Sequence, residues 1–272
     1  KMLAYLNYEN GYFIEIGAGD GVYLSNTYYF EKYKNWRGVL VDPVLHHYIN
    51  CVQERPKSKV FLSAATSFEK RAHFLKIIQE EIKQNSVEIL AAYQEESALP
   101  EGRAKGELQR TLDQIERFIE VLEDGSFSQA TLHTNGPDLR KILVPIGPVV
   151  VFGASNFPLA FSTAGGDTIS ALAAGCPVIV KGHPYHAGTS ELMAQAIHSA
   201  LKKTGLPLEL FSHLGGESHQ IGSQLVRHPL IKGVGFTGSF TGGKALYDLA
   251  QKRSEPIPVF AEMGSINPIF IL

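Results

Sequence analysis

The feature that most constrains the fold is an alternation of short apolar runs and longer amphipathic segments between residues 143 and 262. Runs such as Val149–Phe152 and Pro177–Val180 are apolar throughout. Strands of this kind are buried on both faces, as in a parallel sheet that is covered by helices. The pattern therefore predicts an α/β fold. The predicted strands are 149–152, 177–180, 208–211, 231–236 and 257–261, and the predicted helices are 158–174, 189–201, 220–226 and 244–250.

Polar residues follow several of these predicted strands. The carboxyl ends of parallel strands lie at one edge of a sheet, where such folds bind ligands, so we expect Gly153–Phe157, Lys181 and Phe236–Ser239 to lie along that edge. The turn Thr237–Gly243 leads from a strand into a helix and is rich in glycine. Its backbone N–H groups can bind an anion such as a cofactor pyrophosphate.

Asn156 has two interpretations. A neutral amide at the end of a buried strand can donate a hydrogen bond to a developing oxyanion. The alternative is a helix cap for the helix predicted to begin at Pro158.

The first part of the chain has a different character. A strand at Gly11–Ile16, the turn Gly17–Gly21, a helix at Ser25–Tyr33 and a strand at Gly38–Val41 predict a βαβ nucleotide-binding unit. The sequence of this unit resembles that of S-adenosylmethionine-dependent methyltransferases of the FkbM type. The resemblance extends to about Ala64, although a doubly wound methyltransferase needs several more strands. The resemblance implies S-adenosylmethionine as a ligand, with Glu15, Gly17, Gly19 and Asp42 in its pocket.

Two long helices are predicted between these parts. Thr66–Glu69 has the spacing of a capping box, and the amphipathic pattern after it predicts a helix to about Ala98. Leu99–Gly102 interrupts the pattern, and Leu108–Leu122 predicts a second helix. We place a domain boundary near residue 65, which divides the chain into segments 1–64 and 65–272.

Composition limits the class of protein. Among 272 residues, 44% are hydrophobic and 19% are charged, which is typical of a globular protein, and the net charge is −2. A chain with so little net charge is not expected to bind nucleic acid or an anionic membrane. We found no apolar run of membrane-spanning length and no signal segment at the start, so we expect a cytoplasmic location and a small-molecule partner. The chain begins at Lys1 and finishes in the apolar run Ile269–Leu272, and both ends look cut.

Two other site types are weakly indicated. Gly153–Ser155 is close to the nucleophile elbow of serine hydrolases, but the elbow needs glycine where this chain has Phe157. His183 and His186 could form a metal pair, but no other metal-ligand residue accompanies them, and ordinary loop histidines are the simpler interpretation.

Four ordered motifs between residue 65 and the end resemble the NAD(P)-dependent aldehyde dehydrogenase superfamily, whose cofactor domain is Rossmann-like. The sequence of these motifs is most similar to the 2,5-dioxovalerate (α-ketoglutarate semialdehyde) dehydrogenase branch of that superfamily. The resemblance implies oxidation of that semialdehyde, or a related one, to the acid with NADP or NAD, and a homo-oligomer for the intact family. The motifs are Asn156–Leu159, Ala173–Lys181, Gly235–Ser239 and Phe260–Gly264.

The resemblance also implies roles for particular residues. Asn156 would donate to the oxyanion, and Glu262 would be the general base that activates water. Glu262 also has a structural interpretation, as a helix-capping or ion-paired acid. Arg103 and Arg110 are guesses for contact with a substrate carboxylate. The residues that would bind the cofactor are Lys181 at the ribose, together with Phe236, Gly238, Ser239, Gly243 and Met263.

Two departures from the family pattern affect the prediction. Pro184 stands where members that prefer NAD often carry glutamate, and without that carboxylate a 2′-phosphate is not repelled, so we expect NADP to bind at least as well as NAD. The family's nucleophile is a cysteine downstream of the base, and no cysteine follows Glu262. Cys51 and Cys176 lie in contexts that do not suit the role. The alternatives are therefore a methyltransferase or a non-catalytic fusion of two fragments.

Overall fold

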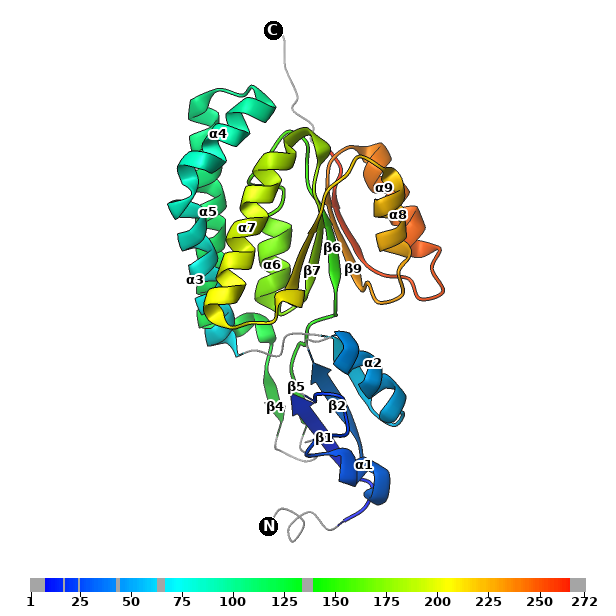
Figure 1. Cartoon of the computed structure of the whole chain (residues 1–272). Helices are drawn as coiled ribbons and strands as arrows, with labels where there is room; N and C mark the ends of the chain where they lie inside the picture. Colours follow the sequence, from blue (N-terminus) through cyan, green and yellow to red (C-terminus); the bar gives the residue numbers. More distant parts are fainter. Residues whose placement is uncertain are drawn as a thin grey trace.

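The larger part of the molecule is built on a five-stranded parallel sheet with the order β10-β9-β6-β7-β8 (Figure 1). The computed structural model describes residues 8–264 apart from 17, 24, 43–44, 63–66 and 134–138. The strands of this sheet are β6 (Val149–Phe152), β7 (Val178–Lys181), β8 (Phe211–Leu214), β9 (Gly233–Thr237) and β10 (Val259–Glu262).

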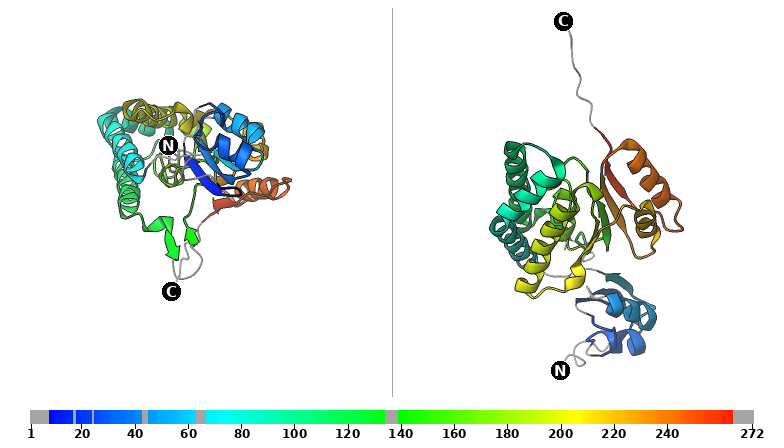
Figure 2. Two further views of the ribbon diagram at one scale, coloured as in Figure 1. Left: turned by 90° about the horizontal axis from the view of Figure 1, so that it is seen from below. Right: turned by 45° about the horizontal axis from the view of Figure 1, so that its top comes forward.

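Successive residues of the central strand pack on opposite faces of the sheet. Val149 and Val151 belong to one buried cluster, and Val150 and Phe152 pack in another. Helices cover both faces, which explains why the strands are apolar throughout (Figures 1 and 2). The first cluster includes side chains of α6 (Gly166–Ala174) and α7 (Ala187–Thr204), and the second includes those of α8 (His219–Arg227) and α9 (Phe240–Gln251).

A further layer of helices packs outside α6 and α7. It consists of α3 (Phe68–Gln84), α4 (Ser86–Ser97) and α5 (Glu101–Asp124). The single helix predicted to Ala98 is wrong, because the helix is interrupted at Asn85, whose side chain donates to the Glu81 carbonyl. Ser67 is the N-cap of α3 and accepts from the Lys70 N–H. Thr66, the predicted start of the capping box, lies outside the described residues.

The first helix after β6 differs most from its prediction. We expected a helix from Pro158, but residues 158–165 form turns and α6 begins only at Gly166. The predicted strand 208–211 is largely a 3-10 turn, with β8 beginning at Phe211. The apolar run Ile269–Leu272 lies outside the described residues. Two short strands, β4 (Thr131–His133) and β5 (Leu139–Lys141), pair antiparallel between α5 and β6.

The N-terminal part forms a separate three-stranded parallel sheet with the order β1-β2-β3. Figures 1 and 2 show it beyond the amino ends of the strands of the large sheet. Phe13, Phe30, Trp36, Leu40 and Cys51 form its core. Its elements are β1 (Tyr12–Ile16), α1 (Tyr28–Lys34), β2 (Arg37–Asp42), α2 (Leu45–Glu54) and β3 (Lys59–Leu62).

The βαβ order predicted from the glycine-rich turn is therefore confirmed for this sheet. The described segments place β3 and α3 on either side of residues 63–66, and the domain boundary near residue 65 stays a prediction. In the described part of the chain, every helix is too short or too polar to cross a membrane.

Candidate functional site

The strand register brings most of the predicted site residues to the carboxyl edge of the five-stranded sheet. Glu262 pairs with Thr237, and Phe152 of the central strand pairs with Phe236 on one side and with Lys181 on the other. Neighbouring strands are about 4.8 Å apart, so three strand spacings separate Glu262 from Lys181 by roughly 14 Å. The edge can therefore hold an extended ligand that contacts both ends of this row.

The turn between β9 and α9 leaves backbone donors free at the middle of this row. Ser239 is the N-cap of α9, and its Oγ accepts from the Gly242 N–H at 3.2 Å. The Gly238 N–H donates to the Glu262 carbonyl at 3.0 Å. The N–H groups of Phe240 and Thr241 have no acceptor among the described residues. Two unpaired donors at a helix N-terminus make a site for an anion.

The glycines of this turn are required by close packing. A Cβ on Gly243 would lie 2.4 Å from Met263 Cγ, and a Cβ on Gly238 would lie 2.7 Å from Phe236 Cζ. The turn thus lies directly against both side chains. Phe236, Gly238, Ser239, Gly243 and Met263, all predicted at the cofactor site, are brought together.

Lys181 is half-buried at the end of β7. Its Nζ donates to the carbonyl of Gly182 at 2.9 Å and to that of Gly216. Burial lowers the pKa of Lys181, and the nearby Glu217 partly opposes that effect. The ammonium is therefore held at the sheet edge, where it can donate to a sugar hydroxyl.

The segment after Lys181 carries no carboxylate. His183 accepts from the Tyr185 N–H at 3.2 Å, and Pro184 begins a 3-10 turn. Burial lowers the pKa of His183 to about 4, and the neighbouring His186 and Lys181 add to this effect. His183 is therefore uncharged at neutral pH.

His183 and His186, for which ordinary loop histidines were the simpler interpretation, both bond to protein groups. His186 is buried, with Nε2 lying 2.8 Å from the Ala154 carbonyl and Nδ1 lying 3.0 Å from Ser190 Oγ. Both of its ring nitrogens are thus occupied by protein groups. Among the described residues, no group of three or more His, Cys, Asp or Glu is arranged to hold a metal ion.

Asn156 lies in the loop between β6 and α6 with an exposed side chain. That side chain has no hydrogen-bond partner in the described part of the chain, whereas its backbone carbonyl accepts from Arg103 Nη2 at 2.9 Å. The alternative that Asn156 caps a helix at Pro158 is wrong, because α6 begins at Gly166. Its amide is therefore available to a ligand.

Glu262 is the last residue of β10 and is exposed. Within the described ranges its carboxylate makes no ion pair and caps no helix, so the structural interpretation of this acid has no support. Its carbonyl accepts from the Gly238 N–H, which connects the end of β10 to the turn before α9.

Neither cysteine lies at this edge. Cys176 is buried and precedes β7, at the amino ends of the strands, and burial raises its pKa. Cys51 belongs to the small sheet, where burial and then Asp42 raise its pKa to about 11. A thiol is a poor nucleophile when its pKa is raised by burial. The prediction that neither is the nucleophile therefore agrees with their environments.

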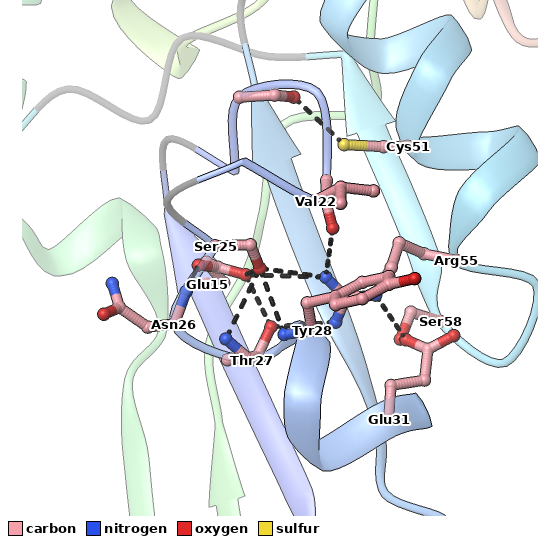
Figure 3. Close-up of polar contacts among 12 residues, drawn as sticks. Glu15, Val22, Ser25, Asn26, Thr27, Tyr28, Glu31, Cys51, Arg55 and Ser58 are labelled. Carbon is pink, nitrogen blue, oxygen red and sulfur yellow. Dashed lines mark hydrogen bonds and ion pairs between the residues drawn. The ribbon is translucent and has the colours of Figure 1, made fainter. Parts of the chain in front are cut away.

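The small sheet also has acids at the ends of its strands. The carboxylate of Glu15 accepts from Ser25 Oγ at 2.8 Å, from the Asn26 N–H at 2.7 Å and from the Thr27 hydroxyl (Figure 3). The fully buried Arg55 donates from Nε to Glu31 at 3.0 Å, and its Nη1 lies 3.8 Å from Glu15. These contacts join the end of β1 to the segment before α1, and α1 to the residue that follows α2.

Asp42, the second predicted acid of this unit, is also bonded within the protein. Its Oδ2 accepts from the Gly19 N–H at 2.9 Å, and its Oδ1 lies 3.0 Å from His47 Nδ1. Gly17 lies outside the described residues. The structure therefore brings Glu15, Gly19 and Asp42 to one end of the small sheet, with both acids engaged by the protein.

Comparison with known families gives one match over most of the chain. The model of the aldehyde dehydrogenase family matches residues 57–272. The α-ketoglutaric semialdehyde dehydrogenase 2 of Azospirillum brasilense is 51% identical over 209 residues, which are 74% of this chain and 40% of that protein. The α-ketoglutaric semialdehyde dehydrogenase of Acinetobacter baylyi is 46% identical over 215 residues, 76% of this chain and 40% of that protein. The chain thus spans 40% of the length of these curated relatives.

Solved structures support the fold. A glyceraldehyde-3-phosphate dehydrogenase GapN from Methanocaldococcus jannaschii, complexed with NADP, superposes with a TM-score of 0.65 at 20% identity over 75% of this chain and 43% of that one. A NAD-dependent benzaldehyde dehydrogenase from Corynebacterium glutamicum gives a TM-score of 0.63 at 24% identity over 74% of this chain and 43% of that one.

Proposed function

Because the chain belongs to the aldehyde dehydrogenase family, we propose that it binds NADP or NAD along the carboxyl edge of its five-stranded sheet, for the oxidation of an aldehyde to the carboxylic acid. The observation that carries the proposal is the row formed by Lys181, the turn before α9 and Glu262, which the strand register sets at one edge. The free backbone N–H groups of the turn before α9 can donate hydrogen bonds to a pyrophosphate. A side chain at Gly238 or Gly243 would clash with Phe236 or Met263.

Each residue of the row has a separate task in this proposal. Lys181 donates to the adenosine ribose, and the N–H groups of Phe240 and Thr241 donate to the pyrophosphate. The nucleotide, when bound, would supply the hydride acceptor. Asn156 donates its side-chain N–H to the oxyanion that forms when a nucleophile attacks the aldehyde. Glu262 takes a proton from the water that releases the acid.

The nucleophile is not one of the two cysteines of this chain. Cys176 lies at the opposite ends of the strands from Asn156, and Cys51 lies in α2, in the core of the N-terminal part. We therefore expect the 272-residue chain by itself to bind the nucleotide without oxidising the aldehyde.

The proposed substrate is 2,5-dioxovalerate, also called α-ketoglutarate semialdehyde. The support is the identity of 46% and 51% to two relatives that carry this substrate in their names.

We propose that NADP binds at least as well as NAD. The support is Pro184, since no carboxylate stands there to repel a 2′-phosphate, and the uncharged His183 adds no negative charge. The cytoplasmic location and the homo-oligomeric state of the intact family stay predictions.

The test of the proposed function needs no turnover. NADPH and NADH are titrated separately onto the purified chain, and the fluorescence of the reduced nicotinamide reports binding. We expect saturable binding that weakens by about tenfold in Lys181→Ala, the loss of roughly one charge-assisted hydrogen bond. The exposed Lys105→Ala is the control. Absence of saturable binding of either nucleotide would contradict the proposal.

Binding of S-adenosylmethionine to the small sheet is a separate prediction. The βαβ order favours it, whereas the internal bonds of Glu15 and Asp42 mean that both acids would have to exchange partners. Calorimetric titration of S-adenosylmethionine onto the wild-type chain and onto Asp42→Ala decides the matter. An equal affinity in the two proteins would count against a site at Asp42.

A further inference from the structure

The loop that carries Asn156 is held by one helix that is far away in the sequence. Arg103, Glu107 and Arg110 of α5 all contact the segment 156–161. Their spacing places them on one face of the helix. This face of α5 therefore forms a support along the length of the loop.

Glu107 fixes the far end of the loop. It is 5% exposed, and its Oε1 accepts from the N–H groups of Leu159 and Ala160 at 2.8 and 3.0 Å. Its Oε2 accepts from the Tyr93 hydroxyl at 2.7 Å. Burial and then this hydrogen bond raise the pKa of Tyr93 to about 12, so the phenol stays a donor. A buried carboxylate with three donors is a rigid anchor, because breaking any of these bonds leaves a charge unsatisfied.

Arg103 holds the backbone of Asn156. Its Nη2 donates to the Asn156 carbonyl at 2.9 Å, and its guanidinium lies over the ring of Phe157, 4.7 Å from the centroid. Arg110 lies over the ring of Phe161 at 4.8 Å, and the two rings meet edge to face with centroids 5.1 Å apart. Each guanidinium thus holds one ring of the loop.

The end of the loop that follows β6 is also held by hydrogen bonds. The Ala154 N–H donates to the Phe161 carbonyl at 2.8 Å, and the Ala154 carbonyl lies 2.8 Å from His186 Nε2. Asn156 therefore lies between two fixed points, and the bond from Arg103 acts on its own peptide. Its side chain has no hydrogen bond of its own in the described structure, so the contacts of the loop act on Asn156 by fixing the position of its backbone.

We propose that Arg103 and Glu107 are positioning residues for the oxyanion donor Asn156. The proposal deepens the function given above and rests on it. A donor must point to the place where the oxyanion forms, and a preorganised donor stabilises that charge without a cost of reorientation. This role competes with the guess that Arg103 contacts a substrate carboxylate, because its Nη2 bonds the loop.

The test measures the mobility of Asn156 by ¹⁵N relaxation of the purified chain with ¹⁵N-labelled asparagine. Loss of its backbone and side-chain signals in Asn156→Ala assigns them. In the wild-type protein we expect an order parameter of about 0.85 for the Asn156 N–H, and a fall below roughly 0.6 in Arg103→Gln and in Glu107→Gln. Arg103→Lys, which keeps a donor, restores part of the order. Arg117→Gln and Glu120→Gln, which alter exposed residues of the same helix, leave it unchanged.

Two further measurements in the same samples separate the possible outcomes. NADPH binding by the wild-type protein reports the proposed function, so loss of that binding and an unchanged Asn156 order parameter are different failures. Titration with 2-oxoglutarate, the product-like dicarboxylate, tests the competing role of Arg103. Order parameters that stay at the wild-type value in both Arg103→Gln and Glu107→Gln overturn the positioning role. If Arg103→Gln instead abolishes 2-oxoglutarate binding and leaves Asn156 rigid, Arg103 is a substrate contact.

Discussion

The two parallel sheets of this chain start from similar strand-turn-helix sequences and end with different surfaces. At the edge of the five-stranded sheet, the amide of Asn156, the carboxylate of Glu262 and two backbone N–H groups of α9 are free of partners within the described residues. In the three-stranded sheet, the corresponding acids Glu15 and Asp42 are bonded to the protein itself.

The two sheets differ in coverage as well. Helices cover both faces of the large sheet, whereas Tyr12 and Ile14 of β1 are 64% and 65% exposed. The comparison teaches that a glycine-rich turn after a strand does not by itself make a binding site. The polar groups beside it must also remain unpaired, and that depends on the packing around them.

The largest effect is expected when Arg55 is removed from the small sheet. Arg55→Met leaves Glu15 and Glu31 buried without their cation, which we expect to cost about 3–5 kcal/mol and to unfold this sheet. NADPH affinity should persist, because the large sheet has its own core. Circular dichroism melts and NADPH titration check both statements, with the exposed Arg37→Met as control. Loss of NADPH binding with the small sheet would show that the two regions depend on each other.

The next largest effect concerns the turn before α9. Gly243→Val places new atoms against Met263 and Phe236, and overpacking of this kind costs about 1–3 kcal/mol. We expect NADPH affinity to fall at least tenfold, since about 1.4 kcal/mol is one factor of ten. Gly106→Ala, where a Cβ would have no neighbour within 4 Å, should bind as the wild type does. Equal affinity of Gly243→Val and the wild type would remove this turn from the proposed site.

A smaller effect is expected when a carboxylate is introduced at Pro184. Pro184→Glu should weaken NADP⁺ binding by up to about tenfold, because two charges about 4 Å apart in water repel by about 1 kcal/mol. NAD⁺ lacks the 2′-phosphate and should bind with little change. Calorimetry with both nucleotides checks the ratio, and Pro184→Gln controls for loss of the proline ring. An unchanged ratio in Pro184→Glu would contradict the placement of the adenosine ribose at Lys181.

A dependence of stability on pH is also expected, through His183. The pKa of His183 is lowered from its usual value of 6.5 to about 4 in the folded protein. Between pH 6.5 and about pH 4 the unfolded chain therefore binds more protons than the folded protein does. Stability is therefore fully present above pH 6.5 and falls as the pH is lowered through this range. Urea unfolding at pH 7 and pH 4.5 measures the fall, which should be smaller in His183→Gln. Part of the fall remains in that variant, because burial also lowers the pKa of His213. Identical pH dependence in the two proteins would show that His183 is not buried as described.

The sequence predicted the sheet more accurately than the loops. All five strands of the large sheet were expected, and four of them overlap the observed strands closely, because a fully apolar run is a local property of the chain. The family resemblance is confirmed by the match over residues 57–272 and by relatives at 46% and 51% identity. The helix predicted from Pro158 is wrong, because residues 158–165 form turns that contact the distant α5, and α6 begins only at Gly166.

The sequence by itself determined the α/β class, the order of the strands along the chain and the identity of Asn156, Lys181 and Glu262 as site candidates. Periodicity and motif spacing are local, so they can be read from one chain. Tertiary structure alone decided which polar groups stay free and which are bonded. The bonds from α5 to the Asn156 loop join residues 52 and 53 positions apart, and the burial of Arg55 depends on contacts between residues 24 to 34 positions apart. Partners at such separations are set by how helices pack, which no local pattern records.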